Sequence, residues 1–147
     1  MTIRLAKPAD LPAVQECADQ AYEPYLARIG RKPAPMVADF EGSIASQVLY
    51  VLEAETQVAG FIVFYPHDDH VHIENVAVYP KFQGIGHGTK LIEFAEHEAR
   101  RLGFSRVELY TNEKMTENIA YYPSLGYHEI GRREERGFNR VFFRKEL

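Results

Sequence analysis

A strand, a glycine-rich loop and a helix follow one another around residues 76–102, and this segment limits the possible folds more than any other. The strand is rich in valine, a proline turns the chain, and the loop has glycine at three alternate positions. The loop residues are Gln83, Gly84, Ile85, Gly86, His87, Gly88 and Thr89. Glycines remove the Cβ atoms that keep a ligand away from the main chain, and a helix start adds unpaired N–H groups. We therefore predict a phosphate-binding loop.

The spacing of the glycines restricts which phosphate compound the loop can bind. A P-loop requires Gly-x-x-x-x-Gly-Lys-Ser/Thr, and no part of the chain has this pattern. A dinucleotide fingerprint requires Gly-x-Gly-x-x-Gly directly after the strand, whereas here Thr89 stands in place of the last glycine and residues 79–83 intervene. A dinucleotide-binding domain, with Glu108 as its ribose ligand, stays open as an alternative.

The composition is that of one cytoplasmic domain. The chain has 147 residues, of which 46% are hydrophobic, and we expect residues 1–147 to form a single domain. The net charge of −4 argues against nonspecific binding to nucleic acid or to an anionic membrane. Neither a signal peptide nor an apolar run of about 18 residues is present, which predicts a soluble cytoplasmic protein. Cys17 lies in an apolar helical pattern, so we expect a buried residue and not a nucleophile.

Hydrophobic periodicity and turn signals predict strands and helices along the whole chain, which defines a mixed α/β class. An amphipathic helix follows Pro8, a crossover rich in Gly and Pro spans residues 25–35, and a second helical piece spans residues 36–45. The long helix after the glycine loop ends near Gly103, and a short helix covers residues 118–124. Strands are expected at residues 3–5, 48–53, 58–65, 71–78, 107–111, 127–132 and 140–145. The second and third form a hairpin around residues 54–57, and the last two pair around Gly137.

A second motif runs from Asn118 to Tyr127 and reads Asn-Ile-Ala-Tyr-Tyr-Pro-Ser-Leu-Gly-Tyr. The loop Gln83-Gly-Ile-Gly-His-Gly88 matches the pattern Gln/Arg-x-x-Gly-x-Gly/Ala, and together the two motifs resemble the GNAT superfamily of N-acetyltransferases. The resemblance extends along the whole chain. It implies an α/β (α+β) fold in which a mixed, mostly antiparallel sheet of six to seven strands is flanked by about four helices. It also implies acetyl-CoA as the cosubstrate.

The resemblance assigns roles around the cofactor. The N–H groups of the loop would bind the pyrophosphate of coenzyme A, with the side chain of Gln83 as a further donor. Asn118 would contact the pantetheine arm. Tyr122 would lie near the sulfur as the general acid; the alternative is an aromatic residue that packs the short helix onto the sheet. The main chain that would pair with the arm, like an added strand, is that of Val76, Ala77 and Val78.

A base must take a proton from the attacking amine, because a lysine-like ammonium with a pKa of about 10.4 is deprotonated in roughly one molecule in 2,500 at pH 7. Strand alternation places His72 and Glu74 on one face of the strand before the loop. In the GNAT family an acidic residue or a histidine on this strand often serves as the base, commonly through water. We prefer Glu74 and place His72 second. The alternative is a partly exposed strand without a catalytic role.

The acceptor is the least determined part of the predicted site. Tyr25 and Arg28 fall where GNAT enzymes shape the acceptor pocket, and Asn112, at the end of a strand, is expected to face the acceptor as well. Residues 67–72 are rich in His and Asp, but no zinc-type spacing with a distant second pair is present, so we predict no metal. An exposed edge of the last strand pair could support a homodimer.

The resemblance to the GNAT superfamily implies an N-acetyltransferase that transfers the acetyl group of acetyl-CoA to a primary amine by direct attack in a ternary complex. The acceptor would be a small-molecule amine or an amine of a peptide or protein, and neither nucleic acid nor a membrane is an expected partner. One alternative is a protein with the same fold that catalyses no reaction and serves as an acyl-CoA-binding or regulatory module. The less favoured alternative is the dinucleotide-binding domain.

Overall fold

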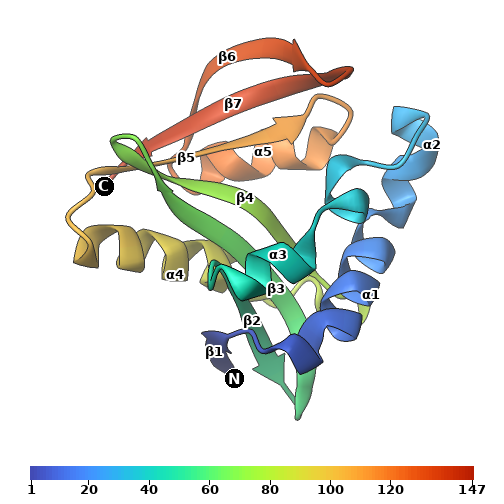
Figure 1. Ribbon diagram of the computed structural model, residues 1–147. Helices are drawn as coiled ribbons and strands as arrows, with labels where there is room; N and C mark the ends of the chain where they lie inside the picture. The colour runs from blue at the N-terminus through green and yellow to red at the C-terminus, as the bar shows by residue number, and fades with distance from the viewer. The chain divides into compact units, whose positions relative to one another are not determined.

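The computed structural model describes residues 1–147 as a mixed α/β fold with a seven-stranded sheet (Figure 1). The strand order is β1-β2-β3-β4-β5-β7-β6; the sheet is mostly antiparallel, and β4 and β5 run parallel. The predicted fold class is confirmed. The strands are β1 (Thr2–Leu5), β2 (Leu49–Ala54), β3 (Gln57–His67), β4 (His70–Val78), β5 (Arg106–Asn112), β6 (His128–Glu135) and β7 (Phe138–Glu146). The helices are α1 (Leu11–Tyr22), α2 (Leu26–Ile29), α3 (Phe40–Ala45), α4 (His87–Arg101) and α5 (Thr116–Ser124), with short 3₁₀ turns η1 (Pro8–Asp10), η2 (Glu23–Tyr25), η3 (Ala34–Val37) and η4 (Pro80–Phe82).

The helical piece expected near residues 36–45 ends where predicted but is interrupted and starts later. Residues Ala34–Val37 form a 3₁₀ turn, and α3 starts only at Phe40. The break lies at Asp39, whose side chain accepts a hydrogen bond from the Gly42 N–H at 3.0 Å. An Asp side chain that bonds a nearby N–H competes with helix continuation and instead caps a helix start.

The chain divides into two compact units. Unit 1 consists of Met1–Phe64 and Asn75–Phe94, and unit 2 consists of Tyr65–Glu74 and Ala95–Leu147. The boundaries fall inside β3, β4 and α4, so each of these elements contributes residues to both units. The glycine loop belongs to unit 1, and the candidate bases belong to unit 2.

Unit 1 is built on β1, β2 and the first part of β3, which pair antiparallel. Glu55 and Thr56 have φ of 53° and 64°, so a tight turn in the left-handed region closes the β2–β3 hairpin where the sequence predicts it. Phe40 of α3 packs edge-on against Phe61 of β3, with ring centroids 5.1 Å apart. Other fully buried side chains of this unit are Val14, Cys17, Leu49, Val51, Leu52, Ile62, Val63, Leu91 and Ile92. This apolar core supports the strand and the helix on either side of the glycine loop.

Unit 2 combines β5, β6 and β7 with the start of β4, the second half of α4, and α5. Figure 1 shows β6 and β7 in red as a long hairpin, which turns at Arg136 and Gly137 with φ of 53° and 80°. β5 pairs with β7 over its whole length, whereas its parallel register with β4 covers Val71–Ile73. The buried apolar side chains of this unit include Val71, Ile73, Ala95, Ala99, Val107, Leu109, Val141 and Phe143.

Two further expectations concern exposure to solvent. Cys17 is fully buried in α1, and burial raises the pKa of its thiol to about 12. A thiol with this pKa is not a nucleophile near neutral pH, which confirms the sequence interpretation. None of the helices combines the length and the apolar character that crossing a bilayer would require.

Candidate functional site

The glycine loop of unit 1 is an exposed turn between η4 and α4. Gly84 and Gly86 have φ of 83° and 92°, in the left-handed region that favours glycine. Nothing lies within 4 Å of the position that a Cβ would take at either residue. The backbone path, and not tight packing, therefore requires these glycines. Residues 83–86 are exposed and 87–89 are half-buried, so the loop presents its main chain to solvent.

The start of α4 adds hydrogen-bond donors to the loop. The first bond into the helix runs from the Lys90 N–H to the Gly86 carbonyl at 3.1 Å. The N–H groups of His87 and Gly88 precede this bond, so they have no intrahelical acceptor. Gly86 has no side chain to cap them, unlike the Ser, Thr or Asp that usually occupies this position. Uncapped N–H groups at the positive end of a helix dipole suit an anion.

The surroundings of the loop also fit a phosphate-bearing ligand. Lys81 and Lys90 flank it, and residues 79–92 contain no carboxylate. The Nδ1 atom of His87 is buried without a hydrogen-bond partner, and its ring lies 6.2 Å from the ring of Phe82. Buried polar atoms without partners are rare in folded proteins, so this atom is an additional polar group that the loop can offer to a ligand.

The side chain of Gln83 turns back toward the strand before the loop. Its Nε2 donates to the carbonyl oxygen of Val78 at 2.9 Å. Val76 is half-buried, whereas Ala77 and Val78 are buried. The amide of Gln83 thus supports the main chain of β4, which differs from the outward pyrophosphate donor that the resemblance implies.

The two candidate bases lie on the part of β4 that belongs to unit 2. Glu74 is exposed, and its Oε1 accepts a hydrogen bond from the Tyr65 hydroxyl at 3.2 Å. The half-buried ring of His72 lies 5.7 Å from the ring of Tyr65 and 5.7 Å from the ring of Tyr110. The structure therefore places the accessible carboxylate of Glu74 beside Tyr65, whose ring also neighbours His72.

The environment shifts the pKa values of His72 and Tyr65 in opposite directions. Burial lowers the pKa of His72 from 6.5 to about 4, and the neighbouring His70 and His67 act in the same direction. His72 is therefore neutral at pH 7 and is a weak base. Burial and the nearby carboxylate raise the pKa of Tyr65 to about 12, so its hydroxyl keeps its proton and can donate to Glu74.

Tyr65 is a site residue that the sequence reasoning missed. It lies nine residues before Glu74 and on a different strand, so no local motif links the two. The signal that could have found it is the turn at residues 66–70 between two predicted strands. Folding those strands back on each other places residues before the turn beside residues after it.

Asn118 and Tyr122 of α5 have partners inside unit 2. The Asn118 Nδ2 donates to the Thr111 Oγ1 at 3.1 Å. Tyr122 is 6% exposed, and its ring centroid lies 6.0 Å from that of Tyr127 and 5.8 Å from that of Phe143. These contacts show that both side chains contribute to packing, and a catalytic role for Tyr122 stays a prediction.

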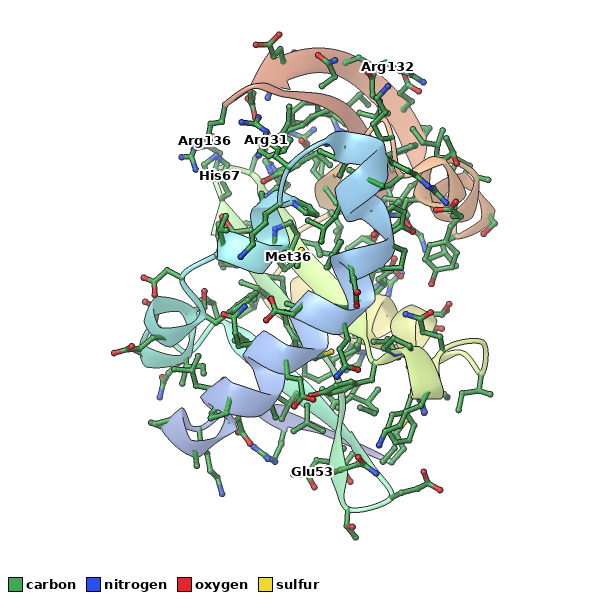
Figure 2. The ribbon with its side chains drawn as sticks, turned by 90° about the vertical axis from the view of Figure 1, so that its right-hand side faces the viewer. Arg31, Met36, Glu53, His67, Arg132 and Arg136 are labelled. Atoms are coloured by element: carbon green, nitrogen blue, oxygen red, sulfur yellow. The ribbon has the colours of Figure 1, made fainter.

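The acceptor candidates occupy turns in their respective units. In unit 1, Tyr25 ends η2, and the guanidinium of Arg28 lies 5.1 Å from the centre of its ring. Figure 2 labels Arg31 and Met36 on the segment that follows these residues. In unit 2, the Oδ1 of Asn112 accepts a hydrogen bond from the Lys114 N–H at 2.9 Å, so this side chain stabilises the turn after β5.

The carboxylate required by the dinucleotide alternative is engaged in ion pairs. Glu108 lies 3.0 Å from Arg144 and 3.6 Å from Arg106, and the Nδ1 of His70 is 3.6 Å away. A carboxylate with these partners would have to break them to bind a ribose hydroxyl. No group of three or more His, Cys, Asp or Glu side chains is arranged to hold a metal ion.

A model of the acetyltransferase (GNAT) family matches residues 13–127. The chain belongs to the GNAT acetyltransferase family. The matched range runs from α1 to the end of the second motif, and so includes the glycine loop of this GNAT protein. A search of curated proteins finds no match.

Solved structures with the GNAT fold are similar to this chain over almost its whole length. The PaiA N-acetyltransferase from Thermoplasma acidophilum, in complex with coenzyme A, has a TM-score of 0.77 at 15% identity, with 99% of this chain and 98% of that chain covered. The ribosomal-protein-S18-alanine N-acetyltransferase from Escherichia coli has a TM-score of 0.79 at 21% identity, with 99% and 93% covered. The N-acetylglutamate synthase from Neisseria gonorrhoeae, complexed with coenzyme A and N-acetyl-glutamate, has a TM-score of 0.76 at 19% identity, with 99% and 35% covered. At these identities the likeness establishes the fold.

Proposed function

We propose that this GNAT protein is an N-acetyltransferase that transfers the acetyl group of acetyl-CoA to a primary amine by direct attack in a ternary complex. The observation that carries the proposal is the exposed glycine loop with its uncapped helix start, in a chain that belongs to an acetyltransferase family. The proposal treats residues 1–147 as one acetyltransferase domain, because the family match includes residues of both units.

Main-chain groups of unit 1 would hold the cosubstrate. In the proposal the N–H groups of residues 83–89 bind the pyrophosphate, and residues 76–78 pair with the pantetheine arm. The coenzyme A in the related Thermoplasma acidophilum and Neisseria gonorrhoeae structures supports this assignment. Acetyl-CoA supplies an acetyl group that is activated as a thioester.

Glu74 is the base that we propose for the acceptor amine. An ammonium with a pKa of about 10.4 needs about 4–5 kcal/mol to lose its proton at pH 7, which a base and desolvation must supply. Glu74 is exposed, so it can accept the proton directly or through a water molecule. His72, with its pKa of about 4, is the weaker candidate, and its neutral ring instead lies beside Tyr65 and Tyr110.

Tyr122 is the proposed proton donor to the leaving thiolate. From reference pKa values of about 10 for tyrosine and about 8.5 for a thiol, complete proton transfer is uphill by about 2 kcal/mol. A hydrogen bond from the tyrosine hydroxyl to the developing charge therefore needs less free energy than full transfer. Asn118 is proposed to contact the pantetheine arm, which would require its bond to Thr111 to be shared or exchanged.

The acceptor is proposed to be a primary amine of a cytoplasmic small molecule, peptide or protein. The related proteins act on different amines, since one acetylates a ribosomal-protein alanine and another makes N-acetylglutamate. Tyr25, Arg28 and Asn112 are proposed to face the acceptor. Arg28 is exposed and cationic, so it could hold an acceptor carboxylate.

The experiment that tests the proposal combines binding with product detection. The purified chain is titrated with acetyl-CoA and with NAD, and is then incubated with acetyl-CoA and amines from a cell extract. We expect binding of acetyl-CoA, release of free thiol, and new acetylated amines in the mass spectrum. Binding of acetyl-CoA without any acetylated product would support the non-catalytic module, and binding of NAD alone would support a dinucleotide-binding domain.

A further inference from the structure

In unit 1, the last residues of β4 direct their backbone groups alternately to two edges. The N–H of Tyr79, the residue directly after β4, donates to the Ala59 carbonyl of β3 at 2.8 Å. A Cβ added at Gly60 of β3 would lie 2.7 Å from the Ala77 carbonyl oxygen, so this carbonyl also lies against β3. Because successive residues of a strand alternate, Val76 and Val78 direct their N–H and C=O groups to the opposite edge.

The opposite edge of β4 is paired over a short length. The register with β5 ends at Ile73 and Leu109. The outward groups of Val76 and Val78 lie beyond this point in the strand. An unpaired edge normally offers N–H donors and C=O acceptors in equal number to an extended ligand.

Two side chains of unit 1 reduce the number of free C=O acceptors on this edge relative to its N–H donors. The Tyr22 hydroxyl, at the end of α1, donates to the Val76 carbonyl at 3.0 Å. The Gln83 Nε2, in the glycine loop, donates to the Val78 carbonyl at 2.9 Å. The carbonyls of Val76 and Val78 therefore already accept a hydrogen bond from a side chain of the protein. The N–H groups of the same two residues still point away from β3. This edge favours ligand acceptors over ligand donors.

The geometry points to Tyr22 as a positioning residue that holds the Val76 carbonyl, so that the edge of β4 presents N–H donors to the carbonyl oxygens of the acetyl-pantetheine arm. The inference rests on the proposed function. The arm contains two amides, each with a donor and an acceptor, and a thioester carbonyl without an N–H of its own. It thus has more carbonyl acceptors than amide donors, which matches a donor-rich edge.

A second tyrosine provides a matched control. The Tyr79 hydroxyl donates to the Ala13 carbonyl of α1 at 3.0 Å. This bond has the same length and joins α1 to the residue directly after β4, but it does not involve an outward carbonyl of the strand. Tyr22→Phe and Tyr79→Phe therefore each remove a phenol bond to a main-chain carbonyl in unit 1 and keep the ring.

The test compares two ligands for each variant. Dissociation constants are measured by calorimetry for acetyl-CoA and for the nucleotide part of coenzyme A, which has the pyrophosphate and lacks the pantetheine arm. We expect Tyr22→Phe to weaken acetyl-CoA binding about fivefold, as for the loss of one net hydrogen bond, and to leave nucleotide binding unchanged. Tyr79→Phe should leave the ratio of the two constants at the wild-type value.

Other outcomes distinguish this inference from the proposed function. If Tyr22→Phe weakens both ligands equally, or neither, the hydroxyl only holds α1 in place and the inference is wrong, whether or not the wild type acetylates amines. If the wild type does not bind acetyl-CoA at all, the proposed function fails first. A Tyr79→Phe variant that discriminates between the ligands as strongly as Tyr22→Phe would also overturn the inference.

Discussion

The glycine loop of unit 1 and the side-chain networks of unit 2 differ in which groups of the polypeptide make their interactions. In the loop, main-chain N–H groups and left-handed glycines form the candidate binding surface. In unit 2, side chains from distant segments bond to each other, as where Tyr127 and Lys145 both donate to Glu96. Main-chain recognition depends on backbone conformation, whereas side-chain recognition depends on tertiary packing. The two regions should therefore respond differently to substitution.

The largest expected effect is on catalysis in unit 2. Glu74→Gln removes the proposed base and nearly preserves its shape, so kcat should fall at least about hundredfold while the dissociation constant of acetyl-CoA stays unchanged. Steady-state kinetics and calorimetry measure the two quantities. Glu134→Gln, an exposed carboxylate on β6, is the control and should keep the wild-type kcat. An unchanged kcat in Glu74→Gln would exclude this residue as the base.

The next effect is on stability, and it concerns the buried carboxylate of α4. Glu96 is 4% exposed; it accepts a bond from the Tyr127 hydroxyl at 2.8 Å and bonds from Lys145 at 3.1 and 3.2 Å. Glu96→Ala leaves two donors without an acceptor and should lower the free energy of unfolding by about 3 kcal/mol. Urea denaturation measures this change.

Glu98→Ala on the same helix is the control for Glu96→Ala. Glu98 pairs with the exposed Arg101 one turn away, at 2.5 Å. An ion pair of this kind contributes less than about 1 kcal/mol. Equal losses in the two variants would show that the network around Glu96 adds nothing beyond a surface pair, and the contrast between the two regions would be weaker.

The stability of the fold should depend on pH because of His72. Its pKa is 6.5 in the unfolded chain and about 4 in the fold, so between these values the unfolded state binds more protons. Stability should therefore decrease as the pH falls from 6.5 to about 4, by up to about 3 kcal/mol from this group. His72→Phe keeps an aromatic ring beside Tyr65 and should flatten the dependence in urea titrations across this range. His128→Gln, on the exposed strand β6, should leave it as in the wild type.

The smallest expected effect is that of alanine at two glycines with similar positive φ angles. Gly86 in the loop and Gly103 after α4 have φ of 92° and 87°, and neither has an atom within 4 Å of a Cβ position. Alanine at either position should cost about 1 kcal/mol of stability. Only Gly86→Ala should also weaken acetyl-CoA binding, because its Cβ stands at the main chain that faces the ligand. Equal affinities in the two variants would contradict a main-chain binding surface.

The parts of the fold predicted from sequence are those with local causes. The glycine loop, the β2–β3 hairpin and the hairpin around Gly137 were each signalled by residues that adjoin in the chain, and the structure confirms them. The helix expected near residues 36–45 starts only at Phe40, because the capping bond of Asp39 competes with a continuous apolar pattern. Local signals are strong where one residue type sets the backbone path, and weaker where two local bonding choices compete.

The residues of the candidate site also divide into those that local sequence patterns identify and those that only the fold brings together. The residues of the loop could be named from glycine spacing, and Glu74 and His72 from strand alternation. Tyr65 is nine residues from Glu74 and could be named only by folding the two strands beside the turn at residues 66–70 onto each other, whereas Tyr22 is 54 residues from Val76 and has no sequence signal.

The sequence by itself determined the class of the protein and the main-chain path of the glycine loop, because glycine conformation and helix starts depend on neighbouring residues. Tertiary structure alone decided the chemical state of the side chains. Burial among Tyr65 and Tyr110 makes His72 a weak base, and the Tyr22 hydroxyl turns an edge of β4 into a donor surface. Desolvation and long-range hydrogen bonds arise only when distant segments pack together, so no local pattern records them.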